Sequence, residues 1–197
     1  MSRRISTLLA VAGTVAGLLA AAPTAGAAVQ LTGSSATTTS GGQAESRQAE
    51  LRAAAEQAAA TGGRHICYSV LLTGSGWQAP VCDGAVAGTV GQSRQLEAVN
   101  IIPADGGTVC GVAHVQNLGW QPQQCGSEFA PLLLGTVGQG LRLESVGVTS
   151  SSGSVCAAGH VQNIGWQPKV CSDIPGRFTY IGTTGQALRL EAMLFTV

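Results

Sequence analysis

The chain has 197 residues, with ten Lys/Arg and ten Asp/Glu, so its formal net charge at pH 7 is zero. This balance excludes a protein that binds nucleic acid through a dense basic surface. Charged residues make up 10% and aromatic residues 4% of the chain, both low for a globular domain, which leaves little apolar area per residue for a core.

Residues 1–27 have the features of an export signal. Arg3 and Arg4 precede an apolar run over 8–22, and small residues over 25–27 predict cleavage before Ala28. A membrane anchor is the alternative, but the run is shorter than the roughly 20 residues that a helix needs to cross a bilayer. Cleavage leaves eight Lys/Arg against ten Asp/Glu, a net charge of about −2. We expect a secreted chain without a membrane span, either released or held at the cell surface.

Residues 28–63 are predicted to be a flexible linker that contains one helix. Ser, Thr and Gly dominate 28–42, which has nothing to bury. Residues 43–60 are almost wholly strong helix formers, and Gly62-Gly63 would end the helix. Leu51 is the only large apolar residue in it, so we expect a short exposed helix.

Three copies of one motif follow over 64–197, at about 64–106, 107–152 and 153–197. In each copy the second cysteine lies fifteen positions after the first, and a tryptophan lies ten positions after the first cysteine. The cysteine pairs are Cys67 and Cys82, Cys110 and Cys125, and Cys156 and Cys171, and the tryptophans are Trp77, Trp120 and Trp166.

The cysteines predict one disulfide within each copy. Their even number, their constant spacing and the export signal all agree with this pairing. A zinc site is the alternative, but no CxxC pair occurs and the pairs lie far apart in the sequence. We therefore expect no metal and no other cofactor.

The cysteine spacing also predicts a hairpin. If the two cysteines are directly opposed, a two-residue turn falls midway between them, at Gly74-Ser75, Asn117-Leu118 and Asn163-Ile164. Gly and Asn tolerate the positive φ of such turns. This register places Trp77 opposite Leu72, Trp120 opposite Val115, and Trp166 opposite Val161.

In the later part of each copy, as in RLESVGV, apolar and polar residues alternate, which predicts another strand. Three units of short strands that bury one another's apolar faces predict an all-β domain. We expect a closed, pseudo-threefold repeat domain, like a β-prism, with a β-trefoil as the alternative.

The segments HVQNLGWQ and HVQNIGWQ, followed by GTVGQGLRLESVGV and GTTGQALRLEAMLF, resemble the ChW repeat, the clostridial hydrophobic repeat with a conserved tryptophan. The resemblance covers about 66–197 and is specific in the second and third copies. The first copy departs from the pattern, with Leu71-Leu72-Thr73 in place of the histidine and the Gln-Asn pair. The resemblance implies an extracellular bacterial protein that is often associated with the cell surface and binds macromolecules. It implies no catalytic residues.

The tryptophans are the first candidate binding residues, because a flat indole ring can stack on a sugar face. Three copies would add avidity for a repetitive polymer, and a role in the core is the alternative. The second group of candidate binding residues has polar side chains that could form hydrogen bonds with sugar hydroxyls. The alternative is that these side chains form hydrogen bonds within turns and strands. The members of this group are His114, His160, Gln116, Gln162, Asn117 and Asn163.

Glu97, Glu144 and Glu191 recur, and an arginine precedes the last two by two positions. Residues i and i+2 of a strand share a face, which predicts a structural carboxylate that pairs with arginine or accepts hydrogen bonds from backbone N–H groups. One Glu per unit does not supply the paired carboxylates of a glycosidase, and no nucleophile elbow occurs. We expect a non-enzymatic binding or adhesion module that recognises polysaccharide or another cell-surface component. A structural or protein-interaction component of the cell envelope is the alternative, and a secreted hydrolase or hydrolase inhibitor is a third hypothesis.

Overall fold

The computed structural model describes residues 39–104, 107–128 and 130–197. The predicted export signal and most of the Ser/Thr/Gly-rich segment lie outside these residues. The described part is mostly β, as predicted, with one helix, α1 (Thr39–Ala59), ahead of the strands. Among these residues no helix is long and apolar enough to cross a membrane.

Each copy of the motif is built from five strands, two long and three short. The first copy has β1 (His65–Leu72), β2 (Gly76–Trp77), β3 (Val81–Cys82), β4 (Ala87–Gly88) and β5 (Leu96–Ala104). The second has β6 (Thr108–Val115), β7 (Gly119–Trp120), β8 (Gln124–Ser127), β9 (Leu132–Gly135) and β10 (Leu143–Ser150). The third has β11 (Val155–Val161), β12 (Gly165–Trp166), β13 (Val170–Ser172), β14 (Thr179–Gly182) and β15 (Leu190–Thr196).

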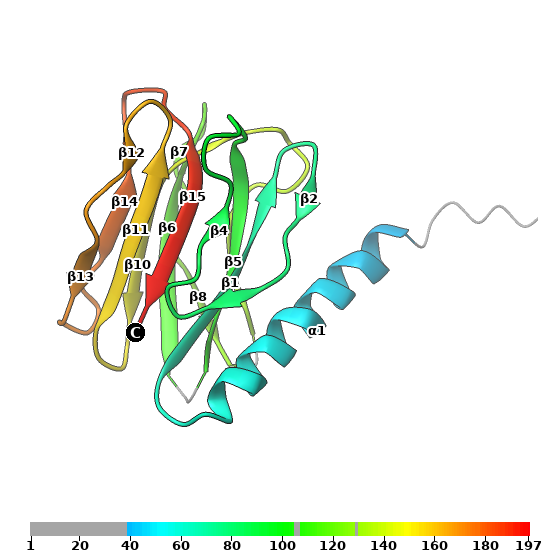
Figure 1. The fold of residues 1–197 in the computed structure, drawn as a ribbon, viewed down its shortest axis with the longest axis vertical. Coiled ribbons are helices and arrows are strands. Elements are labelled where there is room, and N and C mark those ends of the chain that lie inside the picture. The colour runs from blue at the N-terminus through cyan, green and yellow to red at the C-terminus, as the bar shows by residue number, and fades with distance from the viewer. Residues whose placement is uncertain (1–38, 105–106, 129) are drawn as a thin grey trace, which may run out of the picture. The chain divides into compact units, whose positions relative to one another are not determined.

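The strands form three antiparallel sheets, and each sheet combines strands from two copies (Figure 1). Within a copy the two long strands pair along their length, as β1 does with β5, and two short strands pair with the other edge of the first long strand. The last strand of each sheet comes from another copy: β9 pairs with β5, β14 with β10, and β4 with β15. The second copy therefore donates a strand to the sheet of the first, the third copy to the sheet of the second, and the first copy to the sheet of the third. Over the described residues the three sheets are separate and none closes on itself, so the prism or trefoil arrangement stays a prediction.

Alternate residues of β1 belong to two apolar clusters, because successive side chains of a strand point to opposite faces. Ile66 and Tyr68 lie in the main core, which draws residues from all three copies. Cys67 lies in a smaller cluster with Leu51 and Ala55 of α1. The prediction of an exposed helix was therefore wrong for one face of α1. Leu51 and Ala55, one turn apart, are only 2% and 5% exposed.

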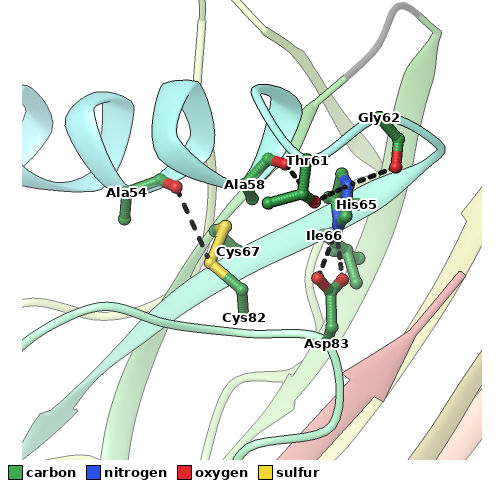
Figure 2. Close-up of polar contacts among 9 residues, drawn as sticks. All are labelled: Ala54, Ala58, Thr61, Gly62, His65, Ile66, Cys67, Cys82 and Asp83. Carbon is green, nitrogen blue, oxygen red and sulfur yellow. Dashed lines mark hydrogen bonds and ion pairs between the residues drawn. A yellow bond between two sulfur atoms is a disulfide. The ribbon is translucent and has the colours of Figure 1, made fainter.

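A polar network joins the end of α1 to the first copy (Figure 2). The Thr61 hydroxyl donates to the carbonyl of Ala58 (2.8 Å) and lies 3.2 Å from Nε2 of His65. On the other side of the ring, His65 Nδ1 is 2.7 Å from a carboxylate oxygen of Asp83, whose second oxygen accepts from the Ile66 amide (3.0 Å). This network fixes the direction in which the chain leaves the helix and enters β1.

Alkaline pH is expected to weaken the fold through Tyr68. Burial raises the pKa of the Tyr68 phenol from 10.0 to about 12, and the hydroxyl donates to the carbonyl of Ala85. Because the pKa is higher in the folded than in the unfolded chain, this stabilisation is complete below pH 10 and is lost as the pH rises to about 12. The expected loss is roughly 2–3 kcal/mol. Urea unfolding at several pH values would measure it, and Tyr68→Phe should remove this part of the pH dependence. An equal alkaline loss in Tyr68→Phe would contradict the assignment.

Candidate functional site

The three predicted disulfides are present: Cys67–Cys82, Cys110–Cys125 and Cys156–Cys171. In each pair the two cysteines are directly opposed on neighbouring strands, as the spacing predicted. The disulfides therefore hold the base of each hairpin, and the tryptophans lie nearer its tip.

The predicted partners of the tryptophans were wrong by one residue. Trp120 lies opposite His114 instead of Val115, and Trp166 opposite His160 instead of Val161. In the first copy Trp77 lies opposite Leu71 instead of Leu72. The cause is a loop of three residues rather than two between the paired ends, as between Val115 and Gly119. The chain returns to the cysteine register in the segment between the two short strands of each hairpin.

The candidate amide residues lie in these hairpin loops. Asn117 and Asn163 are exposed and have positive φ values of 65° and 62°, which Asn tolerates. The backbone amides of Gln116 and Gln162 donate to the carbonyls of Arg142 and Arg189, each at 3.0 Å. The asparagines therefore shape the tip of the hairpin, and the glutamines tie it to the residue just before the second long strand of the copy.

The recurrent carboxylates are buried beneath the histidines. In the second copy Nε and Nη2 of Arg142 donate to Oε1 of Glu144 at 3.0 and 2.8 Å, which confirms the predicted pairing. Nδ1 of His114 lies 3.0 Å from Oε2 of the same carboxylate, close but not aligned as a hydrogen bond. The third copy repeats this cluster with Arg189, Glu191 and His160, whose Nδ1 lies 3.2 Å from the carboxylate. Each histidine is thus held between a buried carboxylate and a tryptophan.

Two exposed aromatic side chains, Trp120 and Tyr180, meet at the junction of the second and third copies. Trp120 packs edge-on against His114 (ring centroids 5.3 Å apart) and against Tyr180 of β14 (5.6 Å). Tyr180 stacks on Phe178 at 5.8 Å. Trp120 is 47% and Tyr180 51% exposed. We call Trp120, Phe178 and Tyr180 the aromatic shelf.

The other two tryptophans differ from each other. Trp166 is 41% exposed and packs edge-on against His160 at 5.6 Å. Trp77 is half-buried, and the guanidinium carbon of Arg47 from α1 lies 5.3 Å from the centre of its ring. The three equivalent tryptophans therefore present three different surfaces.

Sequence reasoning missed the glutamine after each tryptophan. The side chain of Gln167 accepts from the Gly182 amide (2.7 Å) and donates to the Gly182 carbonyl (3.1 Å), and Gln78 makes the same pair of bonds to Gly88. Gln121 accepts from the Gly135 amide at 3.1 Å. These bonds hold the strand that each copy donates to another sheet. The recurrence of Gly-Trp-Gln was the signal in the sequence.

Tyr180 and Phe178 were missed because they lie in the segment where the copies differ. A Cβ at Gly147 would lie 2.4 Å from the Tyr180 ring, so the absence of a side chain there gives the ring its place. Among the described residues, no group of three or more His, Cys, Asp or Glu side chains could hold a metal ion.

The comparisons with known proteins identify the repeat. No curated protein and no solved structure matches the chain. The model of the family described as Clostridial hydrophobic W matches residues 72–102, 114–149 and 160–194. Each matched stretch contains the tryptophan, the Gly-Gln turn and most of the second long strand, and the first cysteine of each pair precedes it. The chain therefore belongs to the Clostridial hydrophobic W family and carries three of its repeats.

Proposed function

We propose that this protein is a secreted, non-catalytic module that binds polysaccharide or another polymer of the cell surface through the aromatic shelf. The observation that carries the proposal is the exposure of Trp120 and Tyr180 in a chain with only 4% aromatic residues. Large aromatic side chains dominate core energetics when they are buried. Trp120 and Tyr180 are half-exposed and in edge-to-face contact, so they form an apolar surface of two rings at a steep angle, each with a polar N–H or O–H group on its edge.

Sugar rings suit such a surface. The apolar face of a pyranose can pack on an aromatic ring, while its hydroxyls bond to polar groups at the rim. Trp166 offers a further exposed ring in the third copy. A repetitive polymer that touches both the shelf and Trp166 would gain avidity over a single sugar.

One further feature supports a location outside the cell, and another supports a non-catalytic role. Disulfides persist in oxidising compartments, and all six cysteines are paired. Glu144 and Glu191 are each bound by an arginine, which suits a structural carboxylate better than an acid or base in catalysis.

Pull-down with insoluble polysaccharides, followed by calorimetry with soluble oligosaccharides, tests the proposal. Trp120→Ala and Tyr180→Ala should each weaken binding about tenfold or more, as expected for the loss of roughly 1.4 kcal/mol of stacking. Leu133→Ala is the matched control, because Leu133 lies two residues before Gly135 as Tyr180 lies two before Gly182. Binding that survives both aromatic substitutions, with unfolding unchanged, would reject the shelf as the site.

A structural or protein-interaction component of the cell envelope is the second candidate. Leu118 and Ile164, at equivalent places in two hairpin loops, are 55% and 52% exposed. Exposed apolar residues at repeated positions suit contact with another protein. Self-association that free sugars do not inhibit, and that Leu118→Asn and Ile164→Asn abolish, would favour this function over the first.

A further inference from the structure

The carboxylate of Glu97 in the first copy is buried without the cationic partners of its counterparts. It is only 5% exposed, and its Oε2 accepts from the backbone amide of Gly140 at 3.0 Å. Among the residues that the structure describes, no Lys, Arg or His lies within ion-pair distance of it. A buried carboxylate is costly unless it is paired.

The repeats show which residues are missing. The arginine two residues before Glu144 and Glu191 is replaced by Gln95 in the first copy, and the histidine six residues before the tryptophan is replaced by Leu71. Gln95 donates instead to the carbonyl of Gly140 at 2.7 Å. Two copies thus supply a guanidinium to their glutamate from the residue just before the second long strand, and the first copy does not.

An open pocket lies at this place. It has a volume of about 690 Å³ and is lined by Glu97, Trp77 and Leu71 of the first copy and by Arg47 and Glu50 of α1. The indole Nε1 of Trp77 is buried and has no hydrogen-bond partner among the described residues. The guanidinium of Arg47 lies over the Trp77 ring, but it forms no ion pair with either carboxylate of the pocket. We call this the Trp77 pocket.

We propose that the Trp77 pocket binds the guanidinium of an arginine side chain from a partner protein, with contacts to the Trp77 ring and the Glu97 carboxylate. A guanidinium is planar, is weakly hydrated, stacks on aromatic faces and donates two parallel bonds to a carboxylate. It is also the group that Glu144 and Glu191 already bind in the other copies. Arg47 holds the cation position over Trp77 in the free protein and moves aside when the partner's arginine enters. This site is independent of the aromatic shelf.

Calorimetry with N-acetyl-arginine amide at low ionic strength tests the proposal, with the citrulline analogue as the neutral, isosteric control. The arginine compound should bind at least tenfold more tightly than the citrulline compound. Trp120→Ala should leave this binding unchanged, which separates the Trp77 pocket from the polymer site. Equal binding of the two compounds, or no binding of either to the Arg47→Ala variant, would overturn the proposal.

Three substitutions sharpen the result. Glu97→Gln should weaken binding of the arginine compound at least tenfold. Gln95→Arg should abolish binding while preserving the fold, because it supplies a guanidinium two residues before Glu97, as Arg142 does for Glu144 in the second copy. Arg47→Ala should tighten binding severalfold, because it removes the internal cation over Trp77. Binding that is unaffected by both Glu97→Gln and Gln95→Arg would show that the carboxylate is not the recognition group.

Discussion

Replacing Gly135 by alanine is expected to lower the free energy of unfolding by about 3–4 kcal/mol. Gly135 has a φ of 96°, and a Cβ added there would lie 2.3 Å from the backbone oxygen of Glu97 and 3.0 Å from Cα of Ala98. Because these are backbone atoms of the paired strand β5, relief requires that β9 separate from the sheet. Chemical denaturation followed by circular dichroism would measure the loss.

The control for this variant is Gly138→Ala. Gly138 also has a positive φ, 70°, but a Cβ there meets nothing within 4 Å. Its substitution should cost only about 1 kcal/mol, from the backbone conformation alone. The difference between the variants measures how closely the donated strand approaches its neighbour. Equal losses would mean that the strand contact adds nothing to the cost of the positive φ.

Removal of a disulfide is expected to have a comparable effect. Cys110→Ala with Cys125→Ala should cost about 3 kcal/mol, the value for a closed loop of 15 residues. The three bonds should also differ in their rates of reduction. Cys67 is fully buried, and Sγ of Cys82 lies 3.9 Å from the Ala54 carbonyl of α1, a packing contact because a disulfide sulfur carries no hydrogen (Figure 2). Cys125 and Cys171 are exposed.

A time course in dithiothreitol, with alkylation and peptide mass spectrometry, would follow each bond separately. The second and third disulfides should open first, and Cys67–Cys82 last. Leu51→Ala should accelerate the opening of Cys67–Cys82 alone, because Leu51 packs in the same cluster as Cys67. If all three bonds open together in the unaltered chain, α1 does not protect the first one.

The disulfides could be predicted because the spacing recurs in three copies, which selects one pairing out of many. The hairpin loop could be predicted only in part. Asn117 was assigned correctly to a turn, but two- and three-residue loops both allow Cys110 and Cys125 to face each other. The residue that compensates lies between β7 and β8, where the sequence has no periodicity to fix the register.

The docking of α1 and the donation of strands were beyond the reach of sequence patterns. Alanines give little hydrophobic contrast along a helix, so the buried face formed by Leu51 and Ala55 could not be recognised. A strand as short as β4, with two residues, cannot show alternation, and its partner β15 lies about a hundred residues later in the chain.

The candidate site was partly visible in the sequence. The pairing of Arg142 with Glu144 could be predicted from their spacing of two residues, which places both on one face of an extended segment. The contact of Trp120 with Tyr180 joins two different copies, so no local sequence pattern encodes it. The replacement of His and Arg by Leu71 and Gln95 could be seen in the sequence. That this replacement leaves a buried carboxylate beside a pocket, without a cationic partner in the described part of the chain, could be recognised only from the structure.

The cyclic donation of strands constrains how such a protein can change its length. In an open array of repeats each unit touches only its neighbours, so units can be gained or lost one at a time. Here, removing the third copy would take away both β14, which the second copy's sheet requires, and β15, on which β4 is seated. A fourth copy would have to be inserted between two copies that already exchange strands. Because every sheet needs a strand from another copy, we expect changes in chain length to be accommodated in the loops instead of in the number of copies.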